Sequence, residues 1–230
     1  MSISADVFPE QRLIWPGAML GSIAHAIFVC RFPDFSNEQS WDGTNYNVQD
    51  SAGSRGTIAF AGDKFVGVFF YKSSKRNPFH SGSRYDLNRF FAGLPQDLRP
   101  LAHDEALQYL LQEFNGTTIS VITSAFWGDG IIERATAAEP WADVFDHGAV
   151  LIQNQLLDGD FALTKWAADY ELKPSEIALV KALFDRKMAN PNKSIQLNES
   201  ERLLWEEITS GQEGIEASRE SFAEIGILLP

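Results

Sequence analysis

The chain has 230 residues, of which 44% are hydrophobic and 22% charged, an ordinary composition for a globular protein. Its net charge of −12 disfavours nonspecific binding to nucleic acid or to an anionic membrane, because both repel an acidic surface. A single cysteine, Cys30, excludes an intramolecular disulfide. The charge is uneven along the chain. Residues 1–95 hold 9 basic and 8 acidic side chains, whereas residues 96–230 hold 10 basic and 23 acidic ones.

The first predicted element is a helix over residues 17–31, which follows the break at Pro16–Gly17 and ends before Pro33. The apolar stretch around it is too short and too mixed to cross a bilayer, and no basic cluster precedes it as in a signal peptide. We therefore interpret it as a buried helix of a cytoplasmic protein that does not contact a membrane.

Short strands are predicted around the Asp42–Gly43 turn and again over residues 56–71. In the second region Gly62–Asp63 separates two runs of β-branched and aromatic residues, which predicts a hairpin with a type II′ turn. The second run is apolar on both faces, so we expect an interior strand that is covered on both sides. Gly67 within this run indicates that a neighbouring group packs closely against the strand.

A short helix is predicted over residues 86–92, a longer one over 104–114, and a strand over 118–127. From residue 139 onward the patterns predict only helices, over the ranges 140–157, 160–170, 174–188 and two further segments that begin at the capping signals of Asn198–Glu201 and Ser210–Glu213.

These elements predict an α+β fold. A small, mostly antiparallel sheet covers about residues 40–71 and 118–127, with flanking helices and an all-helical acidic C-terminal portion. We expect an α+β domain over residues 1–136 and a helical portion over residues 137–230 that packs on it, or one continuous domain.

The loop over residues 72–84 is the first candidate site, because it is basic in an otherwise acidic chain. It contains no acidic residue and carries Lys72, Lys75, Arg76, His80 and Arg84. Converging cations of this kind hold a phosphate or a carboxylate, and His80 is the candidate general acid or base of an enzyme. A solvated loop, or one paired with acids of the C-terminal half, has the same sequence pattern.

Trp41, Asp42 and Tyr46 form a second candidate site, an aromatic cleft with a carboxylate for a small ligand. Aromatic residues in such a pattern also serve as core residues. The histidines and the cysteine lack the spacing of metal ligands, and no nucleotide-binding motif occurs, so we expect neither a metal nor another cofactor.

The functional hypothesis from the sequence is a non-catalytic cytoplasmic protein that binds another protein, for instance an inhibitor or an immunity-type protein. Its acidic helical face, with Glu199, Glu201, Glu206 and Glu207, would hold a basic partner. One alternative is an enzyme or a small-anion-binding protein that uses the loop 72–84. Another is a structural subunit that forms a homo-oligomer through an aromatic surface.

Overall fold

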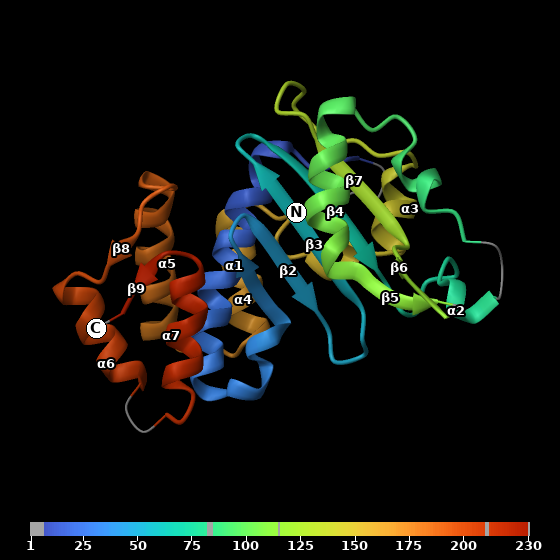
Figure 1. The fold of residues 1–230 in the computed structure, drawn as a ribbon. Coiled ribbons are helices and arrows are strands. Elements are labelled where there is room, and N and C mark those ends of the chain that lie inside the picture. The colour runs from blue at the N-terminus through green and yellow to red at the C-terminus, as the bar shows by residue number, and fades with distance from the viewer. Residues whose placement is uncertain (1–6, 82–84, 115, 210–211, 230) are drawn as a thin grey trace. The chain divides into compact units, whose positions relative to one another are not determined.

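The computed structural model describes residues 7–81, 85–114, 116–209 and 212–229. It confirms the α+β class (Figure 1). The chain forms two compact units, each described here by itself. The sheet unit comprises residues 7–12 and 42–153, and the helical unit comprises residues 13–41 and 154–229. This division differs from the expected one at residue 136, because residues 13–41 cluster with the C-terminal helices and residues 137–153 with the sheet.

The sheet is five-stranded and antiparallel, in the order β1 (Gln39–Asp42), β2 (Asn45–Gln49), β3 (Arg55–Ala61), β4 (Lys64–Phe70) and β7 (Ser124–Gly128). The predicted hairpin is confirmed, since Ala61 pairs with Lys64 across Gly62–Asp63. Gly62 has a φ of +65° and Asp63 does not have a positive φ, as a type II′ turn requires.

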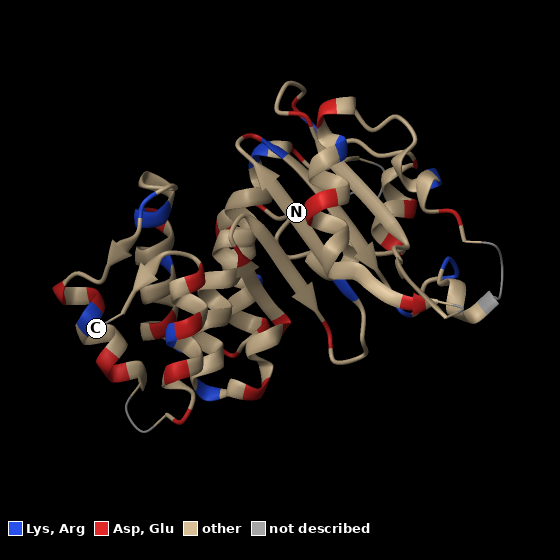
Figure 2. Ribbon diagram, viewed as in Figure 1, with Lys and Arg blue, Asp and Glu red and all other residues tan. Residues whose placement is uncertain are grey.

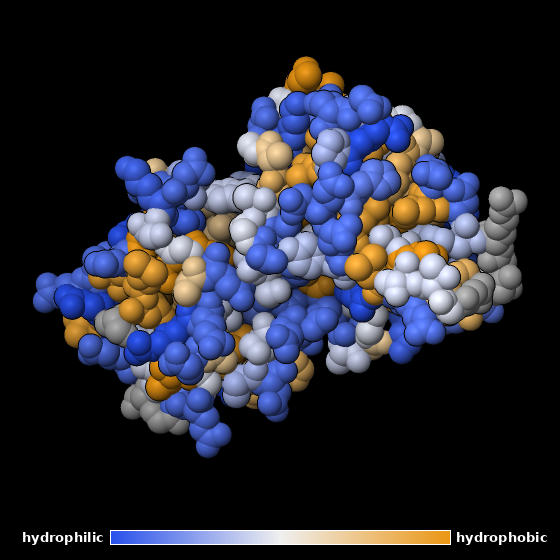
Figure 3. All heavy atoms as spheres, in the orientation of Figure 1, coloured by the Kyte–Doolittle hydropathy of each residue, from blue (hydrophilic) through white to orange (hydrophobic). Residues whose placement is uncertain are grey.

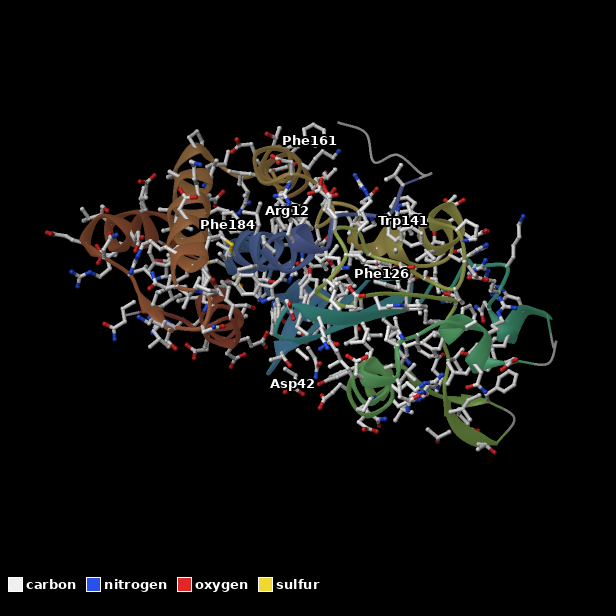
Figure 4. The ribbon with its side chains drawn as sticks, turned by 90° about the horizontal axis from the view of Figure 1, so that it is seen from above. Arg12, Asp42, Phe126, Trp141, Phe161 and Phe184 are labelled. Carbon is white, nitrogen blue, oxygen red and sulfur yellow. The ribbon has the colours of Figure 1, made fainter. Side chains whose placement is uncertain are left out.

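Strand β4 is buried on both faces, as its continuous apolar run predicts. Val66, Val68 and Phe70 belong to a core that also contains Leu107 and Leu110. On the opposite face, the Phe126 ring stacks on Phe69 and meets Trp141 edge-on with ring centroids 5.5 Å apart (Figure 4). A Cβ added at Gly67 would lie 2.7 Å from the Phe126 ring, which explains the glycine in this strand.

The prediction of one helix over residues 104–114 is wrong. The structure has a π-helical turn, η4 (Leu101–Glu105), a 3₁₀ helix, η5 (Ala106–Leu110), and then a strand, β5 (Leu111–Phe114). Strand β5 pairs with β6 (Thr117–Ser120) in a separate two-stranded sheet. The predicted strand 118–127 is consequently divided, because its first part pairs with β5 and its last part, β7, pairs with β4.

The remaining helical segments of the sheet unit are short. They are α2 (Pro78–Ser81), η2 (Leu87–Phe91), η3 (Gln96–Leu98), α3 (Trp141–Asp146) and η6 (Ala149–Ile152). The helix predicted over residues 140–157 is interrupted, because α3 ends at Asp146 and η6 begins at Ala149. Gly148 lies in this break and packs so closely on the sheet that an added Cβ would lie 2.3 Å from Ser124 Oγ.

The helical unit contains most of α1 (Gln11–Arg31), followed by η1 (Pro33–Glu38), α4 (Gly159–Asp169), α5 (Pro174–Ala189), β8 (Ile195–Gln196), α6 (Glu199–Thr209), α7 (Ile215–Glu224) and β9 (Ile227–Leu228). Helix α5 and the start of α6 confirm the predictions, and Asn198 and Glu201 form the predicted reciprocal cap. The predicted cap at Ser210 lies outside the described residues. The C-terminal portion is not entirely helical, because β8 and β9 pair in parallel.

Helix α1 begins six residues earlier than predicted and includes Pro16, so the expectation that this segment is too short and too mixed to cross a bilayer is wrong as to length and composition. Among the described helices, it is the one long and apolar enough to cross a membrane by length and composition, but 78% of its most apolar window is buried. Core helices and signal sequences share these properties, so this match is weak evidence for a membrane span.

Candidate functional site

An open cleft of about 500 Å³ lies in the sheet unit between the start of β3, the segment after β4, and β5. It combines cationic, amide and apolar side chains. The lining residues are Gly53, Arg55, Phe70, Lys72, Asn77, Phe79, His80, Leu111, Gln112 and Glu113. Two residues of the basic loop predicted from sequence, Lys72 and His80, are therefore brought to the same cleft.

The backbone around Lys72 is held in place by hydrogen bonds from both sides. Lys72 N donates to Ser54 Oγ at 3.2 Å, and Asn77 Nδ2 donates to Lys72 O at 2.8 Å. Asn77 also accepts a bond from Phe79 N at 3.0 Å, which fixes the start of α2. The side chain of Lys72 is exposed and runs past Gly53, whose added Cβ would lie 3.9 Å from Nζ. An ammonium group therefore lies at the cleft on a fixed backbone.

Arg55 is the half-buried cation of the cleft. Its Nη2 donates to Leu111 O at 3.0 Å, but its buried Nε has no hydrogen-bond partner among the described residues. Within the same residues no carboxylate lies within ion-pair distance of Arg55, and burial lowers the pKa of its guanidinium. Gln112 Nε2 is a second buried donor without a described partner. Unpaired buried donors of this kind are unusual and favour an acceptor on a ligand.

The apolar part of the cleft consists of Phe70, Phe79 and Leu111. The Phe79 ring meets the Phe70 ring edge-on at a centroid distance of 6.2 Å, which holds it in place although it is 45% exposed. Leu111 is 44% exposed. Glu113 contributes the one carboxylate of the lining, so the cleft holds three basic side chains and one acidic side chain.

The other basic residues of the loop lie elsewhere. Arg76 forms ion pairs with Glu139 at 2.6 Å and with Asp143 at 3.5 Å, so it connects the loop to the start of α3. Lys75 is exposed and does not line the cleft, and Arg84 lies outside the described residues. The alternative that the loop pairs with C-terminal acids thus describes Arg76 but not Lys72.

The predicted aromatic cleft around residues 41–46 is not formed by these side chains in either unit. Trp41 belongs to the helical unit, is 9% exposed and donates from Nε1 to Ser22 Oγ at 2.7 Å. In the sheet unit, Tyr46 is fully buried and Asp42 accepts a hydrogen bond from the Tyr109 hydroxyl at 2.7 Å. Both aromatic side chains are core residues.

The four predicted partner-binding glutamates of α6 differ in exposure. Glu199, Glu206 and Glu207 are exposed, whereas Glu201 is 1% exposed. Glu201 pairs with Arg186 and accepts a bond from Asn198 N at 2.8 Å. Glu201 therefore caps α6 and is not available to a partner.

Ser74 and His147 form a pair that the sequence analysis missed, with Oγ 2.9 Å from Nδ1. Burial lowers the pKa of His147, and the charge of Arg76 lowers it further. Ser74 is only 2% exposed, and its Oγ also accepts a bond from Arg76 N at 3.0 Å. These contacts make it a structural hydroxyl, since a substrate does not reach it. No metal-binding cluster of His, Cys, Asp and Glu occurs among the described residues.

Arg55, Gln112 and Phe79 also line the cleft, although the sequence did not indicate them as site residues. The available signal was Gly53–Ser54–Arg55, a glycine-rich turn that leads into a strand and ends on a cation. Comparison with known proteins adds no assignment, because no family model, curated protein or solved structure matches the chain.

Proposed function

We propose that the sheet unit binds a small organic anion in the cleft of Arg55, Lys72 and His80. The observation that carries this proposal is the half-buried guanidinium of Arg55, which has an unpaired Nε and no carboxylate within ion-pair distance among the described residues. Leaving a buried charged donor without an acceptor is unfavourable, and a bound anion removes that penalty.

The lining defines the chemical class of the ligand. Arg55 and Lys72 supply charge-assisted hydrogen bonds, which favour a carboxylate or a phosphate. Phe70, Phe79 and Leu111 supply an apolar surface, which favours an aromatic or branched aliphatic group on the same molecule. The volume of about 500 Å³ is typical of small-molecule sites. In a catalytic version of this proposal, His80 would transfer a proton to or from the bound anion.

Calorimetry with phenyl phosphate tests this proposal, with inorganic phosphate and benzyl alcohol as the anionic and apolar halves of the probe. We expect phenyl phosphate to bind more tightly than either half. Lys72→Gln should weaken its binding about tenfold or more, because it removes a charge-assisted hydrogen bond. Lys75→Gln is the matched control, since Lys75 is exposed on the same loop but outside the cleft.

Glu113 provides a test of opposite sign. Its carboxylate repels an anion in the cleft, so Glu113→Gln should tighten the binding of phenyl phosphate. The proposal is rejected if phenyl phosphate does not bind, or if Lys75→Gln weakens binding as much as Lys72→Gln.

A second proposal, a protein-binding role for α6, rests on Leu203. This side chain is 64% exposed on the same helix as the exposed Glu199, Glu206 and Glu207. Figure 2 shows acidic positions along this helix in red. An apolar residue among carboxylates suits a basic partner with an apolar contact point. Reversing Glu206 and Glu207 to Lys should abolish binding of such a partner, whereas binding of phenyl phosphate should be unchanged.

A further inference from the structure

The loop that follows β7, residues 129–134, presents two isoleucines to solvent. Ile131 is 86% exposed, the most of any large hydrophobic residue among the described residues, and Ile132 is 49% exposed. Figure 3 shows hydrophobic atoms at the tip of this loop, above a hydrophilic surface. Two adjacent β-branched apolar side chains at a loop tip are unfavourable in water and indicate a binding function.

This loop is held in one conformation by hydrogen bonds at its base. Asp129 Oδ1 accepts bonds from Ile131 N at 2.9 Å and from Ile132 N at 3.2 Å. Gln11, the first residue of α1, binds this loop: its Oε1 accepts from Gly130 N at 3.0 Å, and its Nε2 donates to Arg134 O at 3.0 Å. The isoleucines are therefore displayed on an ordered backbone, so that binding does not have to order the loop.

Carboxylates surround the base of the loop. Gly130 packs against Asp63, since an added Cβ would lie 2.4 Å from its carboxylate. Lys64 Nζ donates a hydrogen bond to Asp97 Oδ2 at 2.6 Å, which is the largest cause of the raised pKa of Lys64, and the charges of Asp63 and Asp129 raise this pKa further. Glu133 adds an exposed carboxylate within the loop. Among the described residues, Asp63 and Glu133 form no ion pair.

We propose that residues 129–134 form a docking loop whose Ile131 side chain inserts into an apolar pocket of another protein, and that basic residues at the rim of this pocket face Asp63 and Glu133. The apolar centre with a charged rim has the composition of a protein interface. The acidic rim selects a basic protein surface and opposes an anionic membrane. This proposal goes beyond the ligand cleft and does not depend on it.

Photo-crosslinking at position 131 in native lysate, with benzoylphenylalanine in place of Ile131, identifies the partner. The same group at position 161 is the matched control, because Phe161 on α4 is a 41% exposed hydrophobic residue that neither proposed binding function uses. The partner captured at position 131 is then purified, and its dissociation constant is measured with the wild type, Ile131→Ser, Phe161→Ser and the double variant Asp63→Asn with Glu133→Gln.

We expect a basic partner whose binding weakens about tenfold or more with Ile131→Ser and is unchanged with Phe161→Ser. The double charge variant should slow association and reduce its dependence on salt. Capture at position 161 alone, capture of only a second copy of the chain, binding to phosphatidylcholine vesicles that Ile131→Ser abolishes, or an unchanged dissociation constant for Ile131→Ser would each overturn the proposal. Unchanged melting temperatures confirm that the exposed substitutions leave the fold intact.

Discussion

The buried imidazole of His25 makes the stability of the helical unit depend on pH. His25 is 1% exposed in α1, and its Nδ1 lies 3.2 Å from the Tyr170 hydroxyl. The aromatic rings of Phe28 and Tyr170 lie beside it, at centroid distances of 6.1 and 5.9 Å. Burial lowers its pKa from 6.5 to about 4, although backbone groups of Ser36 and Phe35 oppose this effect.

The size of the effect follows from the two pKa values. The folded protein binds the His25 proton more weakly than the unfolded chain, so the unfolded state takes up more protons between pH about 6.5 and about 4. The stabilisation by neutral His25 is fully present above pH 6.5 and is lost as the pH falls through about 4. At about 1.4 kcal/mol for each pKa unit, the loss is about 3 kcal/mol.

Urea unfolding across this pH range measures the effect as a difference between variants. The free energy of unfolding of the wild type should fall by about 3 kcal/mol more than that of His25→Gln. The carboxylates titrate in both proteins, so their contributions cancel in the difference between the two curves. Parallel curves for the wild type and His25→Gln would refute the reasoning, as would a His25 pKa above 6 by proton NMR.

Three further predictions concern stability. Glu201→Ala should lower the free energy of unfolding by about 3 kcal/mol, because it removes a helix cap and unpairs an arginine, whereas Glu206→Ala should change it by less than about 0.5 kcal/mol in urea titrations. Gly17→Ala should lower the melting temperature strongly, because the added Cβ would lie 1.8 Å from the backbone oxygen of Gln155. Gly159→Ala should leave the melting temperature unchanged or raise it, because no atom lies within 4 Å of the added Cβ. Lys187→Met should raise the free energy of unfolding at pH 7. Burial lowers the pKa of this lysine, and among the described residues no acid pairs with its Nζ, which donates only to Lys193 O at 3.0 Å; a fall in calorimetric stability would contradict this.

Local patterns predicted those elements that are determined by residues close together in the sequence. The hairpin of β3 and β4 is set by Gly62–Asp63 between two apolar runs, and the start of α6 by the reciprocal cap of Asn198 and Glu201. In both cases the residues that determine the structure are at most a few positions apart. The helix 174–188 was predictable for the same reason, because Pro174 begins it and its apolar face repeats with helical period.

The region of residues 104–114 shows where this reasoning fails. Leu107 and Leu110 are buried at helical spacing, but the next residues form β5 because a second strand, β6, pairs with them. Helical periodicity over one turn does not distinguish a 3₁₀ helix that leads into a strand from a continuous α-helix. The outcome depends on tertiary pairing that the spacing does not encode.

The candidate site was predictable only in part. Charge singled out Lys72 and His80, since cations without neighbouring acids are rare in this chain. Arg76 has the same local pattern but pairs with Glu139, which is 63 positions away. Arg55 was missed because its role depends on the pairing of β3 with β4 and on the position of β5, none of which is visible in the sequence around it.

The side-chain NMR signal of Arg55 tests the central claim most directly. In a ¹H–¹⁵N spectrum of the arginine Nε–H groups, addition of phenyl phosphate should shift and saturate the signal of Arg55, whose Nε lacks a partner among the described residues. The signal of Arg76, whose guanidinium is paired with Glu139 and Asp143, should stay in place. A titration that leaves the Arg55 signal unchanged, or moves both signals equally, would contradict the assignment of the cleft as an anion-binding site.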